Sequence, residues 1–87
     1  MTKQTIISNL KNISDSYQTD IDNTVTMFRI NDTGKCFSIK ITVGTIYCGT
    51  IYCNCIQIYD GDLIQFINNG EIISIFDYSF IEKIKLL

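Results

Sequence analysis

The sequence predicts a mainly β protein, in which an N-terminal α-helix precedes a small, strongly bent antiparallel barrel of about five to six strands. The period of the apolar residues changes from that of a helix to that of a strand beyond Asn23. Turn sequences rich in Asn, Asp and Gly separate the later apolar runs. The 87 residues allow one core only. We assign residues 1–22 to the helix and a connector, and residues 23–87 to the barrel.

The helix is expected over the first apolar stripe of the chain. Its residues stand at helical spacing, and they are Ile6, Leu10, Ile13 and Tyr17, with Ile7 widening the stripe. Polar residues dominate from Ser14 to Asn23. This segment is therefore expected to connect the helix to the strands without a core of its own.

A series of short strands is expected after the connector. Residues Cys36 to Val43 alternate between apolar and polar, which is typical of a half-buried strand. A strand at Val25 to Ile30 is expected before it, across an Asn-Asp-Thr-Gly turn at 31–34. Turns at 60–62 and 68–70 separate the later strands, which are expected at Leu63 to Ile67, Glu71 to Phe76 and Ile84 to Leu87.

The pentapeptide Gly-Thr-Ile-Tyr-Cys occurs twice in succession, at 44–48 and 49–53. Residues five apart on a continuous strand face opposite sides, so Ile46 and Ile51 share a core only if one extra residue is absorbed between them. Glycine bends a strand without a Cβ penalty, and we therefore expect a sharp bend at Gly49. A chance duplication without structural meaning is the alternative.

Composition argues against a nucleic-acid-binding protein of the usual basic kind and against an enzyme. Seven basic and nine acidic residues give a net charge of −2, whereas proteins that track phosphate backbones are usually basic. Histidine is absent, which removes His-based catalysis and mixed His-Cys metal sites. We assign no catalytic residue, no metal and no cofactor.

The four cysteines are expected to be reduced. Residues 1–17 lack the apolar core of a signal peptide, so a cytoplasmic location is predicted. The uncharged run 41–59 is rich in Thr, Gly and β-branched residues, which indicates strands rather than a membrane span. Small buried hydrophobes are expected instead of a zinc site, because the usual two-residue knuckle is missing from the spacing of Cys36, Cys48, Cys53 and Cys55.

Six residues are candidates for ligand contacts. The rings of tyrosines can stack on nucleobases, and lysines can contact phosphates; the residues are Tyr47, Tyr52, Tyr59, Tyr78, Lys83 and Lys85. Cross-strand packing of the tyrosines and a solvated strand face for the lysines are the alternatives. Asp60 and Asp62 flank Gly61 and are expected to serve a turn rather than a metal or acid–base site.

Two stretches of the chain follow the motifs of one family. The first runs through Phe37, Ile39, Ile41, Gly44, Gly49 and Tyr59-Asp60-Gly61, and the second through Ile72, Ile73, Ile75, Phe76, Asp77, Tyr78, Ile81 and Ile84. In this order residues 34–84 resemble the Sm-like family, closest to its bacterial Hfq branch. The resemblance implies an Sm-like or SH3-like barrel, ring-like assembly and RNA as ligand. Asp77-Tyr78 stands where the family has a Lys-His pair, and Asp62 stands where it has a stacking aromatic residue.

Two functions follow as hypotheses. The first is a non-enzymatic, homo-oligomeric binding module for RNA or a nucleotide; pairing between subunits would protect the uncharged strand edges within residues 41–59. The alternative is a phage- or mobile-element-encoded protein-interaction module that inhibits a host or defence protein, consistent with small size and mild acidity.

Overall fold

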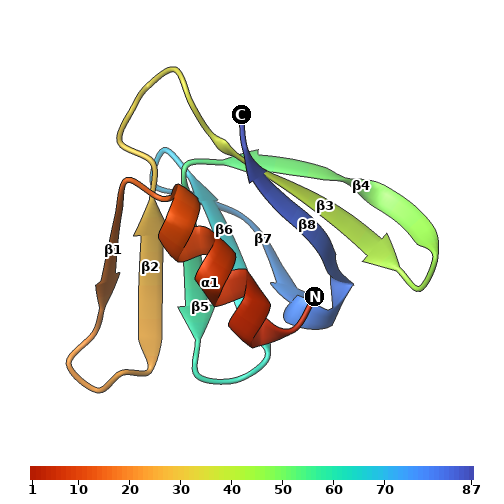
Figure 1. The fold of residues 1–87 in the computed structure, drawn as a ribbon, viewed down its shortest axis with the longest axis horizontal. Helices are drawn as coiled ribbons and strands as arrows, with labels where there is room; N and C mark the ends of the chain where they lie inside the picture. The colour runs from red at the N-terminus through yellow and green to blue at the C-terminus, as the bar shows by residue number, and fades with distance from the viewer.

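The computed structural model describes residues 1–87, which form one helix and two antiparallel sheets (Figure 1). The elements are α1 (Lys3–Ile13), β1 (Ser16–Thr19), β2 (Val25–Arg29), β3 (Phe37–Val43), β4 (Ile46–Cys53), β5 (Cys55–Tyr59), β6 (Leu63–Asn68), β7 (Glu71–Asp77), the 3₁₀ turn η1 (Tyr78–Phe80) and β8 (Ile81–Leu86). One sheet has the order β1-β2-β5-β6-β7 and the other β4-β3-β8. The mainly β class and the N-terminal helix are confirmed, whereas the strands are more numerous than expected and no pairing closes them into a barrel.

A nearly continuous strand connects the two sheets. Only Asn54 separates β4 from β5, and the chain changes from the three-stranded to the five-stranded sheet at this residue. The repeat does place an extra residue beside Gly49, because Ile41 pairs with Gly49 and Thr42 with Tyr47, leaving Cys48 as a bulge. Gly49 has φ +139°, a conformation that favours glycine. The expected bend is thus a bulge at this position, and the change of sheet occurs later, at Asn54.

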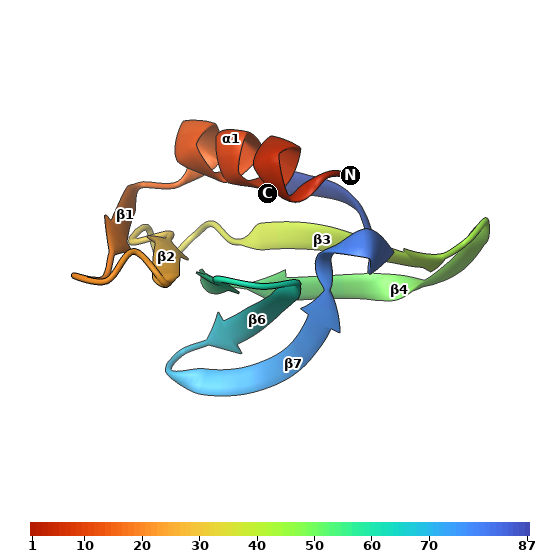
Figure 2. The same cartoon turned by 90° about the horizontal axis from the view of Figure 1, so that it is seen from below.

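Helix α1 is shorter than its apolar stripe. Its N-cap Thr2 accepts a hydrogen bond from the Thr5 N–H, and Ile6 and Leu10 on its inner face are fully buried. Figure 2 shows α1 across one side of the strands, with β6 and β7 on the opposite side. The helix ends before Tyr17, which was expected to extend it. Tyr17 lies instead on β1 and packs on Phe28, with the two ring centroids 5.8 Å apart.

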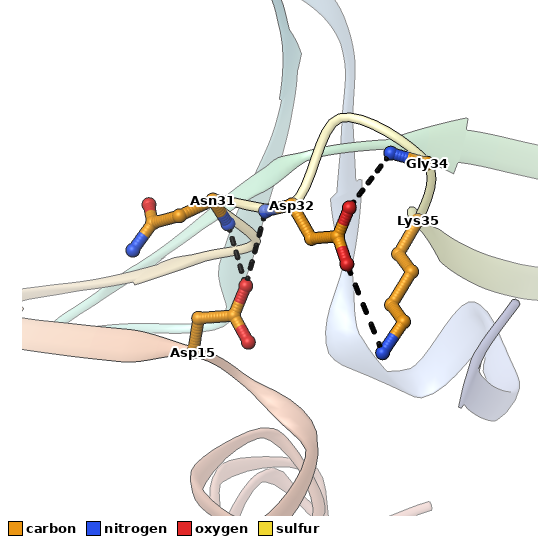
Figure 3. Close-up of polar contacts among 5 residues, drawn as sticks. All are labelled: Asp15, Asn31, Asp32, Gly34 and Lys35. Carbon is orange, nitrogen blue, oxygen red and sulfur yellow. Dashed lines mark hydrogen bonds and ion pairs between the residues drawn. The ribbon is translucent and has the colours of Figure 1, made fainter.

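The segment expected to be a connector therefore contains a strand. β1 pairs with the edge of β2, although all four of its residues are exposed. The carboxylate of Asp15 fixes the approach to this strand, since it accepts hydrogen bonds from the N–H groups of Asn31 and Asp32 at 2.7 and 3.3 Å (Figure 3). Asp32 in turn accepts from the Gly34 N–H and pairs with Lys35, as the predicted turn at 31–34 requires.

The core lies between the two sheets and under α1. Its buried members are mainly isoleucine and phenylalanine from α1 and from the strands other than β1 and β7, and they are Ile6, Leu10, Phe28, Ile30, Phe37, Ile39, Ile41, Cys53, Ile56, Ile58, Ile64, Phe66, Ile81 and Ile84. The last strand begins at Ile81, earlier than the expected Ile84, because η1 turns the chain back onto β3 directly after β7. The structure contains no helix with the length and apolarity needed to cross a membrane.

Candidate binding face

Lysines and tyrosines gather on the outer face of the three-stranded sheet. Lys40 on β3 pairs with Thr50 on β4 and with Lys83 on β8, so these three side chains point to the same side. One step along the sheet, Ser38 pairs in the same way with Tyr52 and Lys85. We call this surface the lysine face, and it consists of Ser38, Lys40, Tyr47, Thr50, Tyr52, Lys83 and Lys85.

The lysine face contains a hollow of about 390 Å³. All of its residues except Tyr47 line this hollow, together with Leu87. The strands place the residues there because alternate positions of β3 and β8 bury Ile39 and Ile84, which turns Lys40, Lys83 and Lys85 outward. Regular pairing in the sheet therefore builds the hollow.

The lysine face carries excess positive charge in a protein whose net charge is −2. One of its three lysines forms an ion pair, since the Oε2 of Glu82 lies 3.3 Å from the Nζ of Lys40. Glu82 has no partner on β3, since Lys40 pairs with Lys83 and Ile41 with Ile81. Neither Lys83 nor Lys85 forms an ion pair. Two free ammonium groups therefore border the hollow.

Two exposed aromatic rings complete the lysine face. Tyr47 and Tyr52 are 57% and 54% exposed. The Nζ of Lys40 stands 5.7 Å from the centroid of the Tyr47 ring, and the Tyr47 hydroxyl lies 2.7 Å from Oγ1 of Thr50. These contacts hold Tyr47 beside the hollow and leave most of its ring accessible.

Four of the six predicted ligand contacts therefore come together, namely Tyr47, Tyr52, Lys83 and Lys85. The other two lie elsewhere. Tyr59 follows the change of sheet at Asn54, and its hydroxyl donates to the Gln65 side chain at 2.7 Å on the five-stranded sheet. Tyr78 lies in η1 and packs against the core.

Lys40 was not predicted to be a site residue. Lys40 stands on the polar side of the predicted strand Cys36 to Val43, and that alternation was the available signal. Its position next to Lys83 depends on a pairing between residues 43 positions apart, which no local pattern contains.

The aspartates and cysteines were expected to have structural roles. Asp60 and Asp62 belong to the turn after β5, where Lys3 donates hydrogen bonds to the carbonyl oxygens of Tyr59 and Gly61. Burial raises the pKa of Cys53 to about 12 and also raises the pKa of Cys55, so both thiols are protonated at neutral pH. No group of three or more Cys, Asp or Glu side chains is arranged to hold a metal ion.

Comparison with protein-family models, curated proteins and solved structures finds no match to this chain. The resemblance of residues 34–84 to the Sm-like family therefore stays a prediction. Chemically, the lysine face offers two free cations, two accessible rings and a hollow.

Proposed function

We propose that the protein is a non-enzymatic binding module whose lysine face binds single-stranded RNA or a nucleotide. The observation that carries this proposal is the convergence of Lys40, Lys83 and Lys85 with Tyr47 and Tyr52 around one hollow. Lysines neutralise phosphates and release counterions, and exposed aromatic rings stack on unpaired bases. The two kinds of side chain supply complementary parts of one recognition surface.

The acidic remainder of the protein would orient the nucleic acid. Acidic residues lie in the turns after β1 and β5, on the five-stranded sheet, and they are Asp20, Asp22, Asp60 and Asp62. Like charges repel phosphates from that sheet, whereas the three-stranded sheet attracts them. A net charge of −2 is therefore compatible with a local phosphate site.

We further infer that the two sheets represent an open form of a strongly bent, Sm-like or SH3-like barrel. The single-residue break at Asn54 and the return of β8 to β3 after η1 support this inference. Such a fold leaves strand edges free, and β7 is one of them. Pairing of edges between subunits would give the homo-oligomer that the sequence predicts.

The edge of β7 is suited to self-association. Ile72, Ile73 and Ile75 are each about half exposed, and the strand contains neither lysine nor proline to protect its free edge. We expect Ile73→Lys to lower the native mass measured by light scattering to that of one chain. An unchanged mass would remove β7 from the interface.

A protein-interaction module remains the second candidate function, and the same apolar edge favours it. In that case β7 would pair with a strand of a host or defence protein instead of a second copy. A stable protein partner recovered with the tagged chain, and lost with Ile73→Lys, would support this function. Recovery of RNA alone would count against it.

The first function is tested by fluorescence anisotropy with labelled oligo(U) and oligo(A). Each phosphate contact adds about −0.7 to the slope of log affinity against log salt for a single strand, so Lys83→Gln/Lys85→Gln should flatten the slope by about 1.4. The matched control is Lys11→Gln/Lys35→Gln, which removes the same charge from exposed positions outside the lysine face. Absence of binding by the unaltered protein, or equal losses in both variants, would contradict the proposal.

A further inference from the structure

A second hollow, of about 360 Å³, lies on the five-stranded sheet. Arg29 on β2 pairs with Cys55 on β5, and Cys55 pairs with Ile67 on β6, so one row of side chains crosses its floor. Phe28, Ile56 and Phe66 point to the opposite, buried side of the same strands. The hollow therefore lies on the outer side of these strands and on a different sheet from the lysine face.

Arg29 is the only charged residue that lines this hollow and the only arginine of the chain. It forms no ion pair, and its Nε contacts the sulfur of Met27 at 3.0 Å. The Cys55 thiol is its other hydrogen-bond partner, so the guanidinium contacts only weakly accepting sulfur atoms within the protein. A guanidinium group presents paired N–H donors in a fixed geometry, and no oxygen acceptor of the protein occupies those of Arg29.

No neighbouring anion forms an ion pair with Arg29. Burial raises the pKa of the Cys55 thiol more strongly than the adjacent Arg29 lowers it, so no thiolate pairs with the guanidinium at neutral pH. Asp20 shares a smaller adjacent hollow with Arg29, but its carboxylate is occupied by the Thr24 hydroxyl and the N–H groups of Thr24 and Val25.

Apolar side chains form part of the wall of the hollow, and hydrogen bonds between two asparagines hold its rim in place. Met27, Ile30 and Ile67 supply the apolar wall. On the rim, Asn54 donates to the Asn69 side chain at 2.9 Å and accepts from the Asn69 N–H at 3.1 Å. This reciprocal pair ties the break between β4 and β5 to the turn after β6, so the rim is already ordered before a ligand arrives.

We propose that this hollow binds a carboxylate attached to an apolar group, with the carboxylate on Arg29 and the apolar group against Met27 and Ile67. One unpaired cation matches a monoanion better than a doubly charged phosphate, for which no second cation lines the hollow. The volume lies within the range of small-ligand sites. This site is independent of the lysine face and of the function proposed for it.

The test is a titration of the ¹⁵N-labelled protein with 3-phenylpropionate, followed by NMR. We expect the amide resonances of Arg29, Cys55, Ile67 and Asn69 to shift together. The neutral amide 3-phenylpropionamide keeps the apolar ring without the charge, and acetate keeps the carboxylate without the ring. Each should bind at least about tenfold more weakly than 3-phenylpropionate. Equal shifts with the acid and the amide would overturn the proposal.

Variants separate this site from general charge attraction. Arg29→Gln should weaken 3-phenylpropionate binding at least about tenfold, because the charge-assisted bonds are lost. Arg29 is exposed, so the variant is expected to keep the fold, which its NMR spectrum verifies. Lys83→Gln removes the same charge from the lysine face and should leave binding unchanged. Unchanged binding by Arg29→Gln, or equal weakening in both variants, would refute the assignment.

A further pair of ligands distinguishes a peptide C-terminus from a free small acid as the source of the carboxylate. Acetyl-glycyl-phenylalanine carries the same ring and acid at the end of a peptide, and its C-terminal amide lacks the charge. Tighter binding of the peptide acid than of 3-phenylpropionate identifies a chain terminus as the ligand, and weaker binding identifies a free acid. Binding of the peptide amide as tight as that of the peptide acid would contradict the proposed role of Arg29.

Discussion

Replacing Glu82 by glutamine should strengthen the binding of single-stranded RNA to the lysine face. The Glu82 carboxylate lies 3.3 Å from the Nζ of Lys40, and both side chains are about half exposed, at 48% and 46%. An exposed pair of this kind is worth about 0–1 kcal/mol, which a phosphate must overcome to engage Lys40. A carboxylate about 7 Å from a phosphate adds a repulsion of about 0.6 kcal/mol in water. Together these effects predict a gain in affinity of about three- to fifteenfold at low salt.

The assay for Glu82→Gln is anisotropy of labelled oligo(U) over a series of salt concentrations. The matched control is Glu71→Gln, which changes the net charge equally but lies on β7 of the other sheet. The Glu82 variant should bind more tightly and show a steeper salt dependence, since Lys40 becomes free to neutralise a phosphate. Equal gains in the two variants would show that only net charge matters. Weaker binding by a folded Glu82 variant would refute the assigned role of Lys40.

Three further predictions concern the fold that supports the face. Leu10→Ala empties a fully buried position under α1 and should lower the free energy of unfolding by about 2–5 kcal/mol in urea denaturation, whereas the exposed Ser8→Ala should change it by less than about 0.5 kcal/mol. Asn54→Ala removes both hydrogen bonds to Asn69 and should cost about 1–3 kcal/mol in the same assay; a loss no larger than that of Ser8→Ala would show that the pair does not hold the strand break. The N–H and hydroxyl groups of Ser79 lower the pKa of Asp77, so this carboxylate contributes stability above its unfolded-state pKa that is lost as the pH falls through the lower folded-state value. Asp77→Asn should remove that part of the acid-induced destabilisation, and an unchanged pH profile, followed by circular dichroism, would contradict the shift.

Local hydrophobic patterns predicted the elements that have one face in the core and the other in solvent. β3 alternates because Phe37, Ile39 and Ile41 enter the core, and α1 shows its stripe because Ile6 and Leu10 do. β1 carries no such signal. Its four residues are exposed and depend on backbone pairing with β2, which leaves no trace in hydrophobicity.

The candidate site was predictable only where its residues share one strand. Lys83 and Lys85 stand two apart on β8 and were found together. Lys40 joins them through the pairing of β3 with β8, which depends on the turn at η1. Tyr59 was grouped with Tyr52 on sequence alone, but the change of sheet at Asn54 separates them. Long-range strand pairing therefore places Lys40 in the site, and the position of the strand break places Tyr59 outside it.

The most direct test of the proposed function is NMR mapping of the ¹⁵N-labelled protein with a short oligo(U) strand. We expect the amide shifts to concentrate in residues 38–40, 47–52 and 83–87, which carry and border the lysine face. Raising the salt concentration should reverse these shifts. Shifts confined to the five-stranded sheet, or no shifts at low salt, would contradict the assignment of RNA binding to the lysine face.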